Sequence, residues 1–186
     1  MNVAPLISVR SLRKTYQVGL AGCTASVRAL DDVTLEIGRG EIVALVGSER
    51  SGKTTLLRCA SGLLTADAGL VSRARRPDGL PVVVKYLEEP IELARLCSYD
   101  SSWDLALVDN VLSDDGEARG TFRYTHLIRQ ARAKGAALLL ASANARSVEG
   151  LADRILTLHR GRLLHPPGTE KVAVSRVAEG PVHGLL

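Results

Sequence analysis

Strand-like and helix-like patterns alternate along most of this chain. Largely apolar runs have the length and composition of strands that are buried on both faces of a parallel sheet. These runs are residues 41–47, 81–87, 103–109 and 136–143. Amphipathic segments predict helices over 54–63, 91–97, 124–134 and 147–154. Strands that alternate with helices in this way indicate βαβ units and a mostly parallel sheet.

The two ends of the chain carry different patterns. Residues 7–10, 15–18 and 33–37 are short β-prone runs, and 18–26 has the small residues of a loop. Residues 155–164 predict two short strands around a turn at Arg160 and Gly161. We therefore expect one domain over residues 1–165, in which a β-rich region precedes an α/β core, and a loosely structured tail over 166–186.

Composition narrows the class of protein. A chain of 186 residues with 46% hydrophobic and 24% charged residues can bury a core without disulfides or metals. Its cysteines, Cys23, Cys59 and Cys97, are far apart and odd in number, which predicts neither a disulfide framework nor a thiolate metal site. No leader segment and no apolar run long enough to span a membrane is present, so we expect a cytoplasmic protein with no direct membrane insertion.

Charge and aromatic content bear on partners. The formal net charge is only +4, and four Tyr, one Trp and one Phe leave few platforms on which nucleic-acid bases could stack. A nucleic-acid partner is therefore disfavoured. The basic cluster SRARR at 72–76 is interpreted as a solvated face, with contact to phosphate or acidic lipid as the alternative.

One segment carries a recognisable chemistry. GSERSGKT, residues 47–54, satisfies the P-loop pattern G-x-x-x-x-G-K-[ST] between a predicted strand and a predicted helix. Its glycines let backbone N–H groups point at phosphate oxygens, Lys53 is expected to reach the β- and γ-phosphates, and the Thr54 hydroxyl can bind Mg²⁺. The candidate phosphate-binding residues are Gly47, Ser48, Glu49, Arg50, Ser51, Gly52, Lys53, Thr54 and Thr55.

A P-loop also needs a carboxylate on the metal side, at the end of a neighbouring strand. Asp109 ends the apolar run WDLALVD and is the candidate for this role. Together the P-loop and Asp109 predict a site for ATP or ADP with Mg²⁺.

Two longer stretches resemble the ATP-binding cassette (ABC) ATPases. ISVRSLRKTYQVG followed by VRALDDVTLEIGRGEIVALVGSERSGKTTLLRCASGLLTADAGLV is similar to the N-terminal half of that family, in the style of lipoprotein-export and macrolide-export ATPases. LIRQARAKGAALLLASANARSVEGLADRILTLHRGRLL resembles the family's C-terminal segment. The resemblance implies a P-loop NTPase (RecA-like) α/β fold, a mostly parallel sheet flanked by helices, and an N-terminal antiparallel β subdomain. It also implies that Tyr16 stacks on adenine.

The same resemblance points to a missing segment. YLEEP at 86–90 resembles the family's Q-loop stretch, with Glu88 at the glutamine position, and we keep Glu88 as a further metal-side candidate. Residues 91–109 resemble the helix after the family signature and the Walker B strand. Between Pro90 and Ile91 the family inserts a helical subdomain and the LSGGQ signature, and this sequence has neither.

Further departures concern hydrolysis. Asn110 stands where the family has a catalytic glutamate, Ala143 stands where it has a switch histidine, and the D-loop pattern is not recognisable in 111–118. An asparagine cannot accept a proton at neutral pH. We therefore expect binding of Mg·ATP or ADP with little or no hydrolysis, and we assign no catalytic residue.

Three functions fit these expectations. The first is an accessory nucleotide-binding subunit of an exporter-like system, beside a membrane permease at the inner face of the plasma membrane. The second is a nucleotide-gated scaffold or regulator of a soluble partner protein or biosynthetic enzyme. The third, a small-molecule kinase, is disfavoured because no lid rich in arginine is visible. All three functions are compatible with a homo-oligomer.

Overall fold

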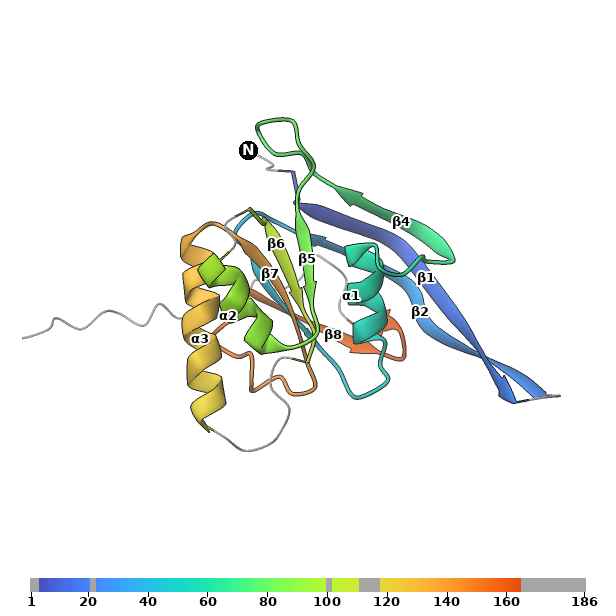
Figure 1. The fold of residues 1–186 in the computed structure, drawn as a ribbon. Helices are drawn as coiled ribbons and strands as arrows, with labels where there is room; N and C mark the ends of the chain where they lie inside the picture. The colour runs from blue at the N-terminus through green and yellow to red at the C-terminus, as the bar shows by residue number, and fades with distance from the viewer. Residues whose placement is uncertain (1–3, 21–22, 100–101, 111–117, 165–186) are drawn as a thin grey trace, which may run out of the picture.

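The computed structural model describes residues 4–20, 23–99, 102–110 and 118–164. They form two sheets and three helices, and Figure 1 shows the helices on both faces of the larger sheet. The expected tail over 166–186 and most of the 111–118 segment lie outside the described residues. The expected α/β class, with an N-terminal antiparallel β region, is confirmed.

The larger sheet has the strand order β5-β6-β7-β3-β8-β9. Its strands are β5 (Val84–Leu87), β6 (Leu105–Val108), β7 (Ala137–Ser142), β3 (Ile42–Val46), β8 (Arg154–His159) and β9 (Arg162–Leu163). All neighbouring strands are parallel except β8 and β9, which turn at Arg160 and Gly161 as expected. Every side chain of β3, β6 and β7 is buried, which is why these strands have continuous apolar sequences.

The smaller sheet has the order β2-β1-β4 and is antiparallel. Strands β1 (Ile7–Leu20) and β2 (Cys23–Ile37) form a long hairpin, and the two strands extend together away from the body in Figure 1. The loop expected over 18–26 is therefore wrong, because Val18 pairs with Ala25 within the hairpin. Strand β4 (Ala68–Arg73) was not expected, since most of its side chains are exposed and its sequence lacks an apolar pattern.

Helix α1 (Lys53–Ser61) follows the P-loop, α2 (Pro90–Tyr99) follows β5, and α3 (Ala118–Ala133) precedes β7. Gly62 ends α1 with a φ of 83°, and its amide donates to the carbonyl of Cys59. The helix expected over 147–154 is wrong: the chain forms turns there, and Gly150 has a φ of 75°, which a right-handed helix cannot accommodate. No described helix is long and apolar enough to cross a membrane.

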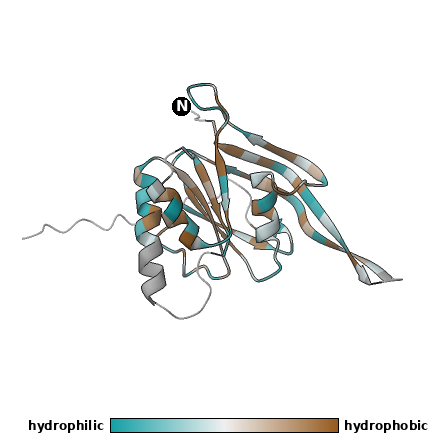
Figure 2. Ribbon diagram, viewed as in Figure 1, coloured by the Kyte–Doolittle hydropathy of each residue, from teal (hydrophilic) through white to brown (hydrophobic). Residues whose placement is uncertain are grey.

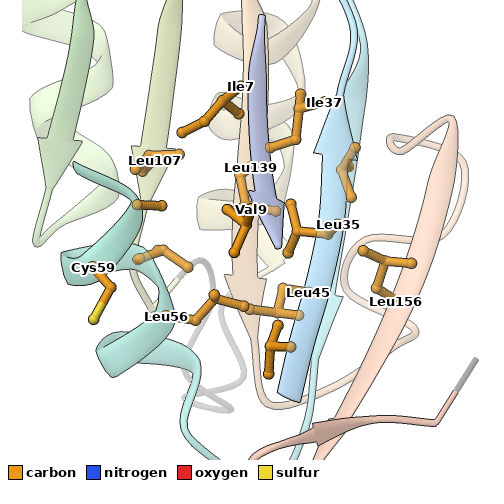
Figure 3. Close-up of a cluster of buried hydrophobic side chains, with 14 of the residues drawn as sticks. Ile7, Val9, Leu35, Ile37, Leu45, Leu56, Cys59, Leu107, Leu139 and Leu156 are labelled. Atoms are coloured by element: carbon orange, nitrogen blue, oxygen red, sulfur yellow. The ribbon is translucent and has the colours of Figure 1, made fainter. Parts of the chain in front are cut away.

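The core has two layers, one on each face of the larger sheet. On one face, Val43 and Leu45 pack with α1 and with the apolar side of the β1–β2 hairpin. Figure 3 shows this layer, in which Ile7, Leu35 and Leu56 point toward Leu45, Leu107 and Leu139. On the other face, Ile42 and Ala44 pack with α2 and α3. Figure 2 shows the same distribution, with hydrophobic residues concentrated along the central strands.

The basic cluster at 72–76 has structural partners. Arg73 donates hydrogen bonds to the carbonyls of Ala60 and Ser61 at the end of α1. Arg76 forms an ion pair with Asp104 at 2.7 Å, just before β6. Most of the cluster is exposed, as the interpretation as a solvated face expects, and Arg73 and Arg76 in addition tie the β4 region to α1 and to the segment before β6.

Candidate nucleotide-binding site

The P-loop connects the buried strand β3 to helix α1 and is packed tightly at its start. A Cβ atom on Gly47 would lie 2.3 Å from the carbonyl oxygen of Leu158 and 2.6 Å from Ser51 Oγ. The Gly47 amide donates to the carbonyl of Ser142 at the end of β7. A glycine is required here by the close approach of neighbouring backbone, which brings the ends of β7 and β8 against the loop.

The second P-loop glycine is required by conformation. Gly52 has a φ of 108°, and a Cβ atom there would lie 2.3 Å from the carbonyl oxygen of Ala29 in β2. Gly161 of the β8–β9 turn approaches the same carbonyl, at 2.7 Å from its hypothetical Cβ. Its amide donates to the carbonyl of Ser51. The loop is therefore held between β2 and the β8–β9 turn.

Lys53 folds back into the loop. Its ammonium group donates to the carbonyl oxygens of Gly47 at 2.7 Å and Ser48 at 2.9 Å, and Ser51 Oγ lies at 3.5 Å. Partial burial lowers the pKa of Lys53, while the negative charges of Asp109 and Glu49 act in the opposite direction. Among the described residues no carboxylate forms a direct ion pair with this half-buried ammonium, so it is suited to receive an anion.

The beginning of α1 adds further donors. Gly52 is the N-cap and supplies no side-chain hydrogen bond, and the first turn contains no acidic residue. The first N–H groups of a helix have no partner within the helix, and the helix dipole makes that end positive. The start of α1 therefore has the character of an anion-binding site.

A cleft of about 290 Å³ opens beside the loop. Its lining consists of Val27, Arg28, Ala29, Arg50, Ser51, Gly52, Lys53, Thr54 and Thr55. Three of these side chains are cationic and none is acidic. The structure thus brings most of the predicted P-loop residues together with one segment of β2, and this cleft is cationic.

Tyr16 lies next to the P-loop, as its predicted role requires. Its hydroxyl is 3.4 Å from Thr55 Oγ1, and its side chain is 38% exposed. In the hairpin it pairs with Val27, which lines the cleft and is 51% exposed. The ammonium of Lys14 lies 5.8 Å from the centre of the Tyr16 ring. An exposed aromatic and an exposed valine therefore lie at the mouth of a cationic cleft.

Asp109 lies directly after β6, at the carboxyl end of the sheet. It is 8% exposed and accepts hydrogen bonds from the Tyr86 hydroxyl at 3.1 Å and the Asn110 amide at 3.0 Å. Asn110 has a φ of 53°, a conformation that asparagine tolerates better than most residues. The Glu88 carboxylate lies 3.3 Å from the guanidinium of Arg58, which belongs to α1.

Sequence reasoning missed three residues near the site. Arg28 lines the cleft, and Arg58 and Tyr86 connect to Asp109. Arg28 lies in the hairpin, where the sequence predicted a loop nearby. Arg58 and Tyr86 come from different elements, so only the fold brings them together. Ala143, where a switch histidine was sought, is exposed directly after β7.

The residues predicted to lie on the metal side, Thr54 and Asp109, fit a magnesium ion that is held jointly with a nucleotide. Among the described residues, no group of three or more His, Cys, Asp or Glu side chains could hold a metal by itself. Mg²⁺ at phosphate sites uses one or two protein oxygens together with phosphate oxygens and water. Thr54 at the start of α1 and the nearly buried carboxylate of Asp109 supply that kind of donor set.

Comparison with known proteins agrees with this geometry. The family profile described as ABC transporter matches residues 30–99, which include the P-loop, α1 and β5. Residues 30–99 are thus similar to the ATP-binding domains of ABC transporters. The phosphonates import ATP-binding protein PhnC 1 of Cupriavidus metallidurans is 51% identical over 63 residues, which are 34% of this chain and 20% of that protein. PhnC of Caulobacter vibrioides is 45% identical over 69 residues, 37% of this chain and 23% of that protein.

The matched segment thus spans 20–23% of the length of these curated relatives. Both relatives are named as import proteins, whereas the sequence resemblance was to export ATPases.

Solved structures share the fold over more of the chain. A nucleotide-free ATP-binding cassette from an ABC transporter has a TM-score of 0.65 at 13% identity, covering 87% of this chain and 90% of that one. A cassette dimer in a post-hydrolysis state, bound to ADP and Pi, has a TM-score of 0.63 at 14% identity, covering 86% and 97%.

No helical subdomain is inserted between β5 and α2, where the ABC family has one. Strand β5 ends at Leu87 and α2 begins at Pro90, so only Glu88 and Glu89 separate them. The carboxylate of Glu92, in the first turn of α2, accepts hydrogen bonds from the amides of Glu88 and Glu89. The junction is therefore a compact, acidic turn.

Proposed function

We propose that this ABC domain binds ATP or ADP with Mg²⁺ at the P-loop cleft and hydrolyses ATP poorly or not at all. The observation that carries the proposal is the cleft itself, which combines Lys53, Arg28 and Arg50 with the uncapped start of α1. A site with several positive charges and free backbone donors favours a polyphosphate over a neutral ligand.

The nucleotide base has a platform beside the phosphates. Tyr16 and Val27 are exposed, cross-strand neighbours at the mouth of the cleft, and the Tyr16 hydroxyl lies near Thr55 of α1. A flat apolar base stacks favourably on an aromatic ring. Their position supports the proposal that adenine stacks on Tyr16 while its phosphates lie along the loop.

Thr54 and Asp109 would hold Mg²⁺ on the phosphate side. When bound, the ion would neutralise negative charge on the phosphates. The chain's own part is to hold Asp109 in place through the Tyr86 hydroxyl and the Asn110 amide. Glu88 is paired with Arg58, and we propose that it acts on the metal side only through that arginine.

Two features support weak hydrolysis. Asn110 follows the metal-side carboxylate and cannot serve as a general base, a role usually worth about 10²- to 10⁴-fold in rate. Helix α2, which resembles the helix after the family signature, begins directly after Glu88 and Glu89 and has Glu92 in its first turn. An acidic helix start repels a γ-phosphate instead of stabilising its charge.

We further propose that the chain works as a nucleotide-binding subunit of an ABC transport system, on the cytoplasmic side of a membrane permease. The relatives named as import ATP-binding proteins support this assignment. A second candidate, a nucleotide-gated regulator of a soluble partner, is favoured by the direct passage from β5 to α2, since it removes the subdomain beside which permeases dock in the family.

Calorimetric titration with ATP and ADP, in Mg²⁺ and with phosphate release followed in the same samples, tests nucleotide binding. We expect binding by the wild type, at least tenfold weaker binding by Lys53→Ala, and release at background. Arg132→Ala, which removes the ion pair between Arg132 of α3 and Asp153 directly before β8, serves as the matched control. Equal binding by wild type and Lys53→Ala would overturn the proposed site.

Co-purification of the tagged full chain from detergent-solubilised membranes and from the soluble fraction separates the two roles. Retention of a membrane-spanning permease supports the transport role. Retention of a soluble partner in the absence of a permease supports the regulator.

A further inference from the structure

A line of side chains connects Asp109 to the protein surface. The Tyr86 hydroxyl lies 3.1 Å from Asp109 Oδ2, and Arg58 Nε lies 3.2 Å from that hydroxyl. Arg58 Nη2 in turn lies 3.3 Å from Glu88 Oε1. Asp109 is 8% exposed, whereas the side chains of Arg58 and Glu88 are 46% and 69% exposed. The line therefore runs from a buried carboxylate, through β5 and α1, to solvent.

The chemistry of these groups fixes the direction of each hydrogen bond. A guanidinium has donors only, so Arg58 must donate to a lone pair of the Tyr86 oxygen. An ionised carboxylate has acceptors only, so the Tyr86 proton must point at Asp109. The Arg58 guanidinium also lies 5.8 Å from the centre of the Tyr86 ring. Arg58 thus orients the hydroxyl, and the hydroxyl orients Asp109.

Both oxygens of Asp109 are held by this arrangement. Oδ2 accepts from Tyr86, and Oδ1 accepts from the Asn110 amide. Each carboxylate oxygen has a second lone pair and can still bind a cation. A carboxylate already fixed in one rotamer loses less conformational freedom when it binds a metal.

We propose that Tyr86 is a positioning residue for magnesium at this site, with Arg58 as the residue that orients it. The inference rests on the proposed function, because it requires that nucleotide binds together with Mg²⁺ beside Asp109. Tyr86 does not touch the nucleotide or the metal in this proposal. Its effect passes through Asp109.

The hydroxyl is not needed to hold the strands together. Tyr86 pairs with Leu107 through the parallel ladder of β5 and β6, and the Asp109 amide donates to the carbonyl of Leu87 at 2.8 Å. The Tyr86 ring packs against the core beside α1. Tyr86→Phe keeps the ring and both backbone contacts, so it removes the hydrogen bond and leaves the fold in place.

The test measures how much Mg²⁺ strengthens ADP binding to the full chain, as the ratio of the dissociation constants in EDTA and in saturating Mg²⁺. We expect Tyr86→Phe to lower this ratio by about tenfold. This is the usual effect of removing a group that hydrogen-bonds to a metal-binding side chain. Affinity in EDTA should change less than about twofold. Arg58→Met should also lower the ratio. Arg132→Met, which breaks the ion pair between Arg132 and Asp153, should leave the ratio unchanged.

A double-mutant cycle separates positioning from a general structural effect. In an Asp109→Asn background, Tyr86→Phe should cause no further loss of the ratio, because the group through which it acts is gone. The same tenfold loss in that background would overturn the positioning role, as would an unchanged ratio for Tyr86→Phe alone. A wild type that binds no ADP would instead overturn the proposed function itself.

Discussion

At the scale of single residues, the start of the P-loop is a position where space decides the amino acid. The φ of Gly47 is not in the left-handed region, so an alanine there meets no backbone penalty. Its Cβ would nevertheless lie 2.3 Å from the Leu158 carbonyl, far inside contact distance. Backbone from β8 and the Ser51 side chain would both have to move.

We predict that Gly47→Ala lowers the free energy of unfolding by about 1–3 kcal/mol, the range for overpacked sites, and weakens ADP binding. Gly38→Ala is the matched control, because its Cβ would come no closer than 3.4 Å, to the flexible Glu41 carboxylate. Urea denaturation of both variants measures the difference. Equal stability of the two variants would contradict this prediction, because it would mean that the backbone of β8 shifts away from an alanine at position 47 at little cost in free energy.

Lys53 gives the site a pH dependence whose sign follows from burial. Its native pKa lies below the unfolded value of 10.5, because burial disfavours the charged form. Between these two pKa values the unfolded chain binds more protons than the native one, so stability rises with pH across that window.

We therefore predict that, relative to Lys53→Met, the wild type without nucleotide gains stability as pH rises toward the unfolded pKa of 10.5. Mg·ADP should reduce this gain, since phosphate supplies a counter-charge that holds the proton on Lys53. Urea denaturation at stepped pH, with and without Mg·ADP, measures both effects. A stability difference that is flat with pH contradicts the lowered pKa.

The sequence could predict those site residues that lie in, or directly after, a recognisable local pattern. The P-loop from Gly47 to Thr55 is one local motif, and Asp109 ends an apolar run. Tyr86 and Arg58 carry no pattern of their own, because their relation to Asp109 depends on β5 lying beside β6 and on α1 packing next to β5. Only the tertiary structure shows that link.

At the scale of elements, the end of α1 depends on an arginine from another strand. Arg73 of β4 donates to the carbonyls of Ala60 at 3.2 Å and Ser61 at 2.6 Å. The last carbonyls of a helix have no partner within the helix, and a cation near them also complements the helix dipole. Strand β4 thus supports the helix that begins at the P-loop.

We predict that Arg73→Gln lowers the free energy of unfolding by about 1 kcal/mol, because the contacts are partly solvent-exposed. Arg10→Gln should change it by less than about 0.5 kcal/mol, since its pair with Glu36 is long, at 3.8 Å, and exposed. Thermal unfolding of the two variants makes the comparison. A larger effect from Arg10 than from Arg73 contradicts this account.

Strands with continuous apolar sequences were predictable, and elements whose form depends on their neighbours were not. β3, β6 and β7 are buried on both faces and have continuous apolar sequences. β4 is mostly exposed and forms because β1 offers it an open edge. Residues 147–154 have helical spacing, but Gly150 adopts a positive φ and the chain turns there instead.

At the scale of the whole molecule, the direct passage from β5 to α2 changes what a second copy could contribute. In the ABC family that the sequence resembles, each P-loop faces the signature of a partner cassette, at the start of a helix. Here the corresponding helix, α2, begins beside Glu88 and Glu89, and its own Glu92 occupies their amides. A second copy would therefore bring negative charge toward the phosphates.

We predict that ATP and Mg²⁺ do not drive self-association of this chain, because neither copy can complete the other's site. Sedimentation velocity should give the same distribution of sedimentation coefficients with and without Mg·ATP, for the wild type and for Lys53→Ala.

Phosphate release should also stay at background in Asn110→Glu, since a restored general base still lacks donors that stabilise the charge on the γ-phosphate. A dimer that forms with Mg·ATP in the wild type and not in Lys53→Ala would contradict the prediction on self-association. It would mean that a surface other than the start of α2 completes the nucleotide site of the second copy. With no such dimer, the charge that stabilises a transition state would have to come from a different protein.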